Sequence, residues 1–342
     1  MNLRELFSTK GGIRMKKSGL LMLVFSLLLL IGVLQACGNS KASGNDELKT
    51  VRLDYAYYSP TSLVLKKFGW LEEEFKKDDV KVEWTLSQGS NKALEFLTSN
   101  SIDFGSAAGA ASLITKSKEV PIQNVYVLSQ PEWTALVSLD NSIKSINDLK
   151  GKKVAATYGT DPYIFLLRAL NEEGLSEKDI KFVNLQHNDG YQALVKGDVA
   201  AWAGLDPIMA TAEQEANAKL FYRNTEFNTY NFLNVREDFE KAYPEAVEKV
   251  IKSYEKARKW IITHPDEAAE IISKEAKIDL NTAKIQLERT NFDQPIPGEQ
   301  QVTALNAAGE VLQKAKVIKS NVDVEKTTNN LVEPSFAKKI IK

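Results

Sequence analysis

From Val51 onward, short apolar runs alternate with amphipathic stretches, and this alternation limits the possible folds more than any other feature of the chain. The runs at 51–58, 80–86 and 122–128 have the length and composition of strands, whereas 59–77 and 90–99 have helical spacing. Strands that alternate with helices are typical of an α/β fold with a mostly parallel sheet. We therefore predict an α/β chain.

The same order of elements begins again at residue 153. The second set alternates three strands with three helices, over 153–157, 161–173, 180–184, 190–196, 199–203 and 206–217. The segments SIDFGSAAGAASLITKS and DVAAWAGLDPIMATAE each contain an acidic turn, a short apolar strand that ends in small residues, and a helix start. Either the chain has two lobes of like topology, or two generic α/β units resemble each other by chance.

The length of the chain also favours two lobes. About 300 residues follow the N-terminal apolar segment, which exceeds the usual size of a single hydrophobic core. We expect two crossings between lobes, at 130–139 and 230–235, and a C-terminal region that is almost wholly helical. The predicted division assigns residues 50–135 and 230–342 to lobe 1 and residues 136–229 to lobe 2.

The N-terminal segment has the composition of an export signal. Basic residues precede an apolar run at 20–34, whose roughly fifteen residues suit a signal-peptide core better than a membrane span. The ending Leu34-Gln35-Ala36-Cys37 looks like a bacterial lipobox, in which the cysteine is lipidated and becomes the first mature residue. We predict a signal peptide over 1–36 and a lipidated, flexible tether over 37–49; the alternative is an uncleaved anchor helix. Translation starts at Met1 or Met15.

Composition excludes several classes of function. The chain has 44 Lys and Arg against 45 Asp and Glu, so its charge balance does not favour nucleic acid as a partner. Cys37 is the only cysteine, so no intrachain disulfide can form. Metal-ligand spacings, phosphate loops, dinucleotide glycine patterns and nucleophile elbows are lacking, and we predict neither a metal nor a cofactor. The two histidines, His187 and His264, are expected at the surface. These observations argue against an enzyme.

A recurring element is a strand that runs into a small, polar loop at the start of a helix. Five loops have this pattern: 58–61, 88–91, 106–109, 158–161 and 204–207. In a parallel sheet such loops share one edge, where ligands bind. Helix starts carry unpaired N–H groups and a partial positive charge, so several of them together can hold an anion. Ordinary helix capping explains the same residues without a ligand.

Small and aromatic side chains add two further signals. The run from Ser106 to Ala111 has no bulky side chain, which allows either close approach of a ligand or close packing of a helix on the sheet. Several aromatic residues fall at expected loop or crossing positions, where they can face an organic ligand. These are Tyr58, Trp133, Tyr158, Tyr163 and Tyr230.

The chain resembles the substrate-binding proteins of bacterial ATP-driven importers for nitrate, sulfonates, taurine and related compounds. The resemblance is carried by the lipobox at Cys37, the two segments quoted above, and the phrase IKSINDLKGKKVAATYGT. It implies a two-lobe periplasmic-binding-protein fold (type II) and a solute cleft between the lobes. Implied partners are a small solute, a membrane permease with its ATPase, and the membrane itself through the lipid; we expect a monomer outside the cytoplasm.

The resemblance and the loop pattern together predict the residues of the cleft. The predicted ligand contacts are Tyr58, Ser59, Thr61, Gln88, Gly89, Ser90, Ser106, Ala107, Ala108, Gly109, Trp133, Tyr158, Gly159, Thr160, Asp161 and Asp206. We predict no catalytic residue.

Two departures from the family pattern bear on the solute. Ala107 and Ala108 stand where family members often have hydroxyl residues, and Asp161 places a carboxylate at a helix start that should attract anions. Asp161 and Asp206 therefore either pair with an ammonium group, as in taurine, or act only as helix caps. A pyrimidine or thiamine-precursor receptor of the same fold remains open, with stacking on Tyr58, Trp133 and Tyr158. A two-lobe enzyme is a third alternative, against which the export signal argues.

Overall fold

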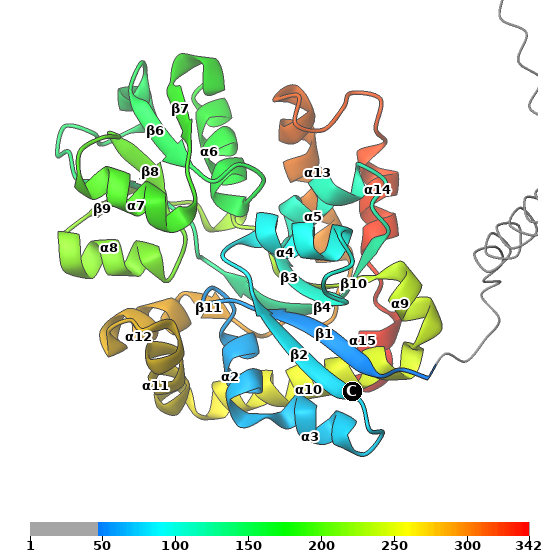
Figure 1. The fold of residues 1–342 in the computed structure, drawn as a ribbon. Helices are drawn as coiled ribbons and strands as arrows, with labels where there is room; N and C mark the ends of the chain where they lie inside the picture. The colour runs from blue at the N-terminus through cyan, green and yellow to red at the C-terminus, as the bar shows by residue number, and fades with distance from the viewer. Residues whose placement is uncertain (1–46, 342) are drawn as a thin grey trace, which may run out of the picture. The chain divides into compact units, whose positions relative to one another are not determined.

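The structure is a computed structural model that describes residues 47–341 (Figure 1). The chain divides into two compact units at Glu47, and all that follows concerns the unit that begins at Leu48. The predicted signal peptide, the lipidation site Cys37 and most of the tether lie outside the described residues.

The first sheet has six strands, in the order β11-β4-β10-β3-β1-β2. Strand β1 runs parallel to β2 and β3, whereas β10 runs antiparallel to both β3 and β4. The strands are β1 (Thr50–Tyr55), β2 (Lys81–Leu86), β3 (Phe104–Ala108), β4 (Ile122–Pro131), β10 (Asn231–Arg236) and β11 (Thr290–Asn291).

The second sheet has five strands, in the order β7-β6-β8-β5-β9. Strand β6 runs parallel to β7 and β8, and β5 runs antiparallel to β8 and β9. The strands are β5 (Leu136–Ser138), β6 (Lys153–Ala156), β7 (Lys181–Asn184), β8 (Ala201–Ala203) and β9 (Lys219–Tyr222). Both sheets thus place their third parallel strand between the first strand and an antiparallel neighbour, which agrees with the repeated order in the sequence.

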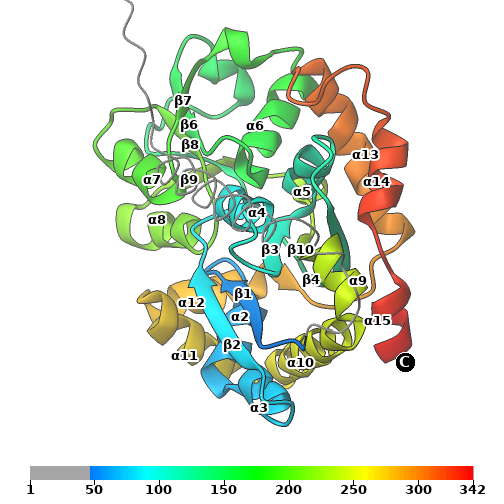
Figure 2. The same ribbon diagram turned by 45° about the vertical axis from the view of Figure 1, so that its right-hand side comes forward.

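Helices flank both sheets (Figure 2). Those of the second sheet's segment are α6 (Asp161–Glu172), α7 (His187–Val195) and α8 (Ile208–Ala216). The others are α2 (Pro60–Phe68), α3 (Trp70–Lys76), α4 (Ser90–Thr98), α5 (Gly109–Lys116), α9 (Glu237–Ala242), α10 (Pro244–Thr263), α11 (Pro265–Ala276), α12 (Leu280–Glu288), α13 (Glu299–Lys314), α14 (Val324–Leu331) and α15 (Ser335–Ile340). Single 3₁₀ turns occur at Ile146–Leu149, Glu177–Asp179 and Thr225–Phe227. The predicted α/β class is confirmed, but the sheets are mixed and not mostly parallel.

The expected helix over 59–77 is two helices, because the chain turns at Gly69. This glycine has φ +63° and closes α2 with a hydrogen bond from its N–H to the Lys66 carbonyl. A left-handed backbone conformation of this kind strains most other residues. The expectation also missed β5 and β9, which pair antiparallel with each other and do not belong to the regular alternation of strands and helices.

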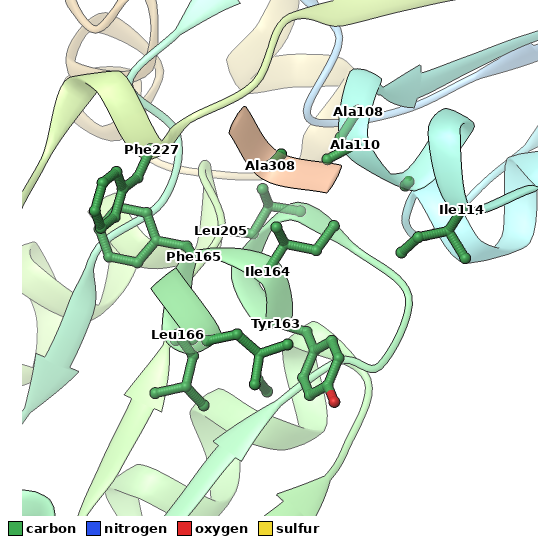
Figure 3. Close-up of a cluster of buried hydrophobic side chains, with 14 of the residues drawn as sticks. Ala108, Ala110, Ile114, Tyr163, Ile164, Phe165, Leu166, Leu205, Phe227 and Ala308 are labelled. Atoms are coloured by element: carbon green, nitrogen blue, oxygen red, sulfur yellow. The ribbon is translucent and has the colours of Figure 1, made fainter. Parts of the chain in front are cut away.

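The two sheets are joined by a hydrophobic cluster around α6. Helix α6 packs against α5 and α13, while α8 packs against α12. Ile164 and Phe165 of α6 belong to one cluster with Ala108, Ala110 and Leu205 (Figure 3). Each fully buried Ile or Phe stabilises such a contact by about 1.5–3 kcal/mol.

This packing accounts for the run of small residues at 106–111. Ala107, Ala108 and Ala110 are fully buried, and a Cβ on Gly109 would lie 3.0 Å from Leu305 Cδ2 and 3.1 Å from Phe232. The small side chains therefore let α5 and α13 approach the sheet closely. The structure therefore supports close packing of a helix on the sheet as the reason for these small residues.

Candidate functional site

A cavity of about 500 Å³ lies between the two sheets. It is lined from the first sheet by Tyr57, Tyr58, Leu86, Ser87 and Gln88, from the second by Gln186, His187, Asn188, Asp189, Tyr191, Leu205, Asp206, Pro207, Ile208 and Thr211, and by Ala276, Lys277 and Ile278 between α11 and α12. Four of the lining loops follow the carboxyl ends of β1, β2, β7 and β8. Ligands of α/β sheets bind at this edge, which makes the cavity the candidate site.

Four helices begin at this cavity. The starts of α2, α4, α7 and α8 follow within three residues of the lining residues Tyr58, Gln88, Gln186 and Pro207. The first N–H groups of a helix have no acceptor within the helix, and they carry a partial positive charge of about half a unit. Lys277 is the one cationic side chain among the lining residues, and it is exposed. Attraction of an anion to this cavity therefore rests mainly on backbone groups.

A buried carboxylate holds the first sheet's side of the cavity in place. Asp54 accepts hydrogen bonds from Ser106 N (2.7 Å), Ser106 Oγ (2.8 Å) and Ser87 Oγ (2.5 Å). The Tyr58 hydroxyl donates to the Ser106 carbonyl at 2.9 Å. Burial raises the pKa of Asp54 to about 6, although all three donors favour its charged form. Ser106, a predicted ligand contact, thus supports Ser87 and Tyr58 and does not itself line the cavity.

Asp161 joins the two crossings to helix α6. Its carboxylate accepts from Trp133 Nε1 at 2.8 Å, Thr229 N at 2.8 Å and Thr229 Oγ1 at 2.6 Å. Trp133 lies on the crossing from β4 to β5, and Thr229 on the crossing from β9 to β10. Asp161 is 1% exposed and does not line the cavity. In this structure Asp161 and Trp133 are hydrogen-bonded to each other, and neither lines the cavity, so the geometry gives no support to an ammonium partner at Asp161 or a stacking surface at Trp133.

Asp206 lines the cavity but is paired with a cation. Arg289 Nη1 lies 3.3 Å from both of its oxygens, and Arg289 Nη2 lies 2.6 Å from Glu213. The Ala210 N–H also donates to Asp206 at 2.9 Å. Burial raises the pKa of Asp206 to about 7, while Arg289 acts in the opposite direction. This ion pair connects the loop after β8 to the end of α12, so it ties the two sides of the cavity together.

The predicted contacts are divided between residues that line the cavity and residues that do not. Tyr58, Gln88 and Asp206 line the cavity. The remaining predicted residues are absent from the lining: Ser59, Thr61, Gly89, Ser90, Ser106, Ala107, Ala108, Gly109, Trp133, Tyr158, Gly159, Thr160 and Asp161.

Several of the residues outside the lining contact other parts of the protein, although a ligand contact was expected. The Ser90 hydroxyl accepts from the Ala108 N–H at 2.9 Å, and the Thr160 hydroxyl donates to the Thr157 carbonyl at 2.6 Å. Tyr158 is 44% exposed and lies against Tyr163, with ring centroids 4.9 Å apart. Ser90 and Thr160 thus make hydrogen bonds inside the protein, and neither hydroxyl caps its own helix.

His187 is the main residue that the sequence prediction misplaced. It was expected at the surface, but it is 2% exposed, begins α7 and lines the cavity. The Thr157 hydroxyl donates to the Leu185 carbonyl at 2.7 Å and lies 3.1 Å from His187 Nδ1. Because this hydroxyl has a single proton, it accepts from Nδ1–H, and Nε2 is left as an acceptor. Burial lowers the pKa of His187 to about 3, so the ring is neutral at pH 7.

Within residues 47–341, no group of three or more His, Cys, Asp or Glu side chains is placed to hold a metal ion. No helix in the same range is long and apolar enough to cross a membrane.

The model of the family described as NMT1/THI5 like matches residues 69–268, which is more than half of the chain. The chain belongs to the NMT1/THI5-like family. The match runs from the break between α2 and α3 into α11, so it includes most of the loops that line the cavity.

Individual proteins similar to this NMT1/THI5-like chain carry the names of binding proteins. The "Putative aliphatic sulfonates-binding protein" of Bacillus subtilis (strain 168) is 28% identical over 95% of this chain and 97% of its own length. The taurine-binding periplasmic protein of Escherichia coli (strain K12) is 24% identical over 68% of this chain and 74% of its own.

A solved structure shares the fold. The alkanesulfonate-binding protein SsuA from Xanthomonas axonopodis pv. citri, bound to MOPS, has a TM-score of 0.75 and 20% identity, and the match covers 83% of this chain and 99% of that protein. This likeness confirms the two-sheet periplasmic-binding-protein architecture expected from the sequence.

Proposed function

We propose that this chain is the extracytoplasmic solute-binding component of an ATP-driven importer. It binds a small organic anion or zwitterion, such as an aliphatic sulfonate or taurine, and delivers it to a membrane permease. The observation that carries this proposal is the cavity between the sheets. It is lined by loops that follow strands of both sheets, and four helices begin beside it. Several helix starts in a water-excluding cleft can together support micromolar binding of an anion, about 8 kcal/mol.

The proposed lobes correspond to residues 50–135 with 230–342, and to residues 136–229. Closure around a solute then occurs at the two crossings, near Trp133 and Thr229. Asp161 contacts both residues, and the Arg289–Asp206 pair contributes to the closed arrangement. Solute binding favours the closed state only to the extent that the solute makes better contacts there, and the permease recognises that state.

The pyrimidine alternative has less support from the cavity. Of its three proposed stacking residues, Tyr58 lines the cavity, whereas Trp133 is buried against Asp161 and Tyr158 lies outside the lining. The enzyme alternative is also less favoured, because the relatives carry the names of binding proteins.

A thermal-shift experiment tests the proposed function. Ethanesulfonate or taurine at 100 times its Kd should stabilise the protein by about 2.7 kcal/mol, because each binds the folded state alone. For a chain of this size, the midpoint of unfolding should rise by on the order of 5 °C. Ethylamine, which lacks the anionic group, is the matched control and should give no shift. No shift with either sulfonate, or turnover of either, would contradict the proposal.

Localisation is a separate prediction. We propose that a lipid on Cys37 holds the protein at the outer side of the cell membrane, with residues 38–49 as a tether. Cys37→Ser should move the protein from the membrane fraction to the soluble fraction, as measured by fractionation and immunoblotting. Solute affinity, measured by calorimetry on both purified forms, should be the same. A variant that stays in the membrane fraction would show that another segment anchors it.

A further inference from the structure

Three buried acceptor atoms at or beside the cavity have no hydrogen-bond partner among the described residues. They are His187 Nε2, Gln186 Oε1 and Asn91 Oδ1. Gln186 and His187 line the cavity from the second sheet, and Asn91 lies in the first turn of α4, which follows β2 of the first sheet. Buried polar atoms without partners are uncommon in folded proteins, and a group of them at a binding cavity indicates a missing donor.

The direction of the missing hydrogen bond at His187 follows from its other nitrogen. The Thr157 hydroxyl donates to Leu185 O at 2.7 Å, which leaves it only its lone pairs for His187 Nδ1. Nδ1 therefore carries the ring proton, and Nε2 presents a lone pair. A group that binds there must donate a hydrogen, so a sulfonate oxygen does not fit this position.

Gly89 lies where His187 and Asn91 come together. A Cβ on Gly89 would lie 2.8 Å from His187 Nε2 and 2.9 Å from Asn91 Oδ1. The Gly89 backbone therefore lies directly against two unpartnered acceptors, one from each sheet. A larger residue at position 89 would push these two side chains aside, because its Cβ would lie in close contact with both atoms.

The charges around the cavity also suit a donor with positive charge. Asp189 lies in the first turn of α7 with His187, and Asp206 lines the cavity from the loop after β8. Asp206 is already paired with Arg289, whereas Asp189 is exposed. Lys277, the cationic lining residue, lies on the separate segment between α11 and α12.

We propose that His187 Nε2, with Gln186 Oε1 and Asn91 Oδ1, accepts N–H donors of the solute, so that the cavity selects an amino-bearing organic anion over the same anion without the amine. This inference rests on the proposed function. The helix starts attract the anionic end, and the acceptors bind the ammonium end. His187 is thus a specificity-determining residue, and the solute class is that of zwitterionic aminosulfonates.

Calorimetry with taurine and ethanesulfonate tests the inference, because the two probes differ only in the amine. The unmodified protein should bind taurine at least tenfold more tightly. His187→Phe removes the acceptor but keeps a planar ring, and it should weaken taurine binding about tenfold while leaving ethanesulfonate within threefold. His187→Gln places an amide oxygen near the position of Nε2 and should retain most of the preference.

Gly89→Ala is a second variant that keeps the histidine, and it keeps the test decisive if His187→Phe does not fold. Its methyl group would displace His187 Nε2 and Asn91 Oδ1 from their positions, so it should also abolish the preference for taurine. Circular dichroism confirms that each variant is folded.

The outcomes separate this inference from the function on which it rests. Equal affinity for the two probes, or equal loss of both in His187→Phe and Gly89→Ala, overturns the inference and leaves the proposed function standing. Binding of neither probe to the unmodified protein overturns the proposed solute class, and the inference with it.

Discussion

Asp161→Asn should destabilise the protein by about 2–4 kcal/mol, although it changes neither the size nor the shape of the side chain. The carboxylate is 1% exposed and accepts three hydrogen bonds, from Trp133 Nε1, Thr229 N and Thr229 Oγ1. An asparagine has one acceptor oxygen, so its amide N–H₂ must face at least one of these donors. A buried donor without an acceptor costs about 1–3 kcal/mol, and more when the lost partner is charged. Chemical denaturation measures the loss.

Asp148→Asn is a matched control for this substitution. Asp148 also accepts three hydrogen bonds, from Lys144 N (3.0 Å), Ser145 N (2.9 Å) and Ser145 Oγ (2.9 Å). Unlike Asp161, it is exposed and accepts all three bonds through Oδ2, so an asparagine oxygen can keep these donors while water satisfies the amide N–H₂. We expect it to cost less than about 1 kcal/mol. Similar losses for Asp161→Asn and Asp148→Asn would show that the contacts of Asp161 with the crossings contribute little.

Asp161→Asn also separates a role of Asp161 at the hinge from a role as a ligand contact. Because Asp161 contacts both crossings and not the cavity, Asp161→Asn should change the affinities for taurine and ethanesulfonate by the same factor. Selective loss of taurine would restore the ammonium pairing that the sequence suggested. Asp161 then differs from His187, whose substitution should affect taurine alone.

The sequence was sufficient for the architecture because the apolar periodicity is strong and repeated. The parallel strands β1, β2 and β3 and their counterparts β6, β7 and β8 were each expected within a few residues of their observed bounds. What the sequence did not show was the antiparallel strand at each crossing. Strands β5 and β10 each pair antiparallel with a strand distant in the chain, and the alternation of strands and helices along the sequence does not indicate such pairing.

The site was predictable as a set of loops but not as a set of side chains. Loops after β1, β2 and β8 do line the cavity, as the strand-end rule requires. Which side chains face the cavity depends on hydrogen-bond partners that sequence spacing does not show. Asp161 accepts a hydrogen bond from Trp133, and Ser106 donates one to Asp54, so neither is free to face a ligand. His187 was missed because α7 was expected to begin at Gly190, three residues too late, which placed the histidine in an exposed loop.

Protonation of the His187 ring should make an unfavourable contribution to stability in acid. Its pKa is about 3 in the folded protein, because burial disfavours the charged ring, against 6.5 in a solvated histidine. Between these values the unfolded chain binds more protons than the folded one, so the stability contributed by the neutral ring is present above pH 6.5 and is lost as the pH falls. At about 1.4 kcal/mol per pH unit, the loss by pH 4 is about 3 kcal/mol.

Two buried carboxylates act with the opposite sign, so the comparison must be made between variants. Asp54 and Asp206 have folded pKa values of about 6 and about 7, raised by burial, so the folded state binds their protons more tightly. Their contribution therefore increases as the pH falls through these values toward 3.8, and it offsets the loss at His187 in the unmodified protein. Asp54 and Asp206 contribute equally to both proteins, so their contribution cancels in the difference in unfolding free energy between His187→Gln and the unmodified protein. That difference should shift by about 3 kcal/mol in favour of the variant between pH 7 and pH 4, and His187→Phe should shift in the same way. Parallel pH profiles would mean that the ring at position 187 is solvated, and they would remove the basis for a neutral acceptor at Nε2.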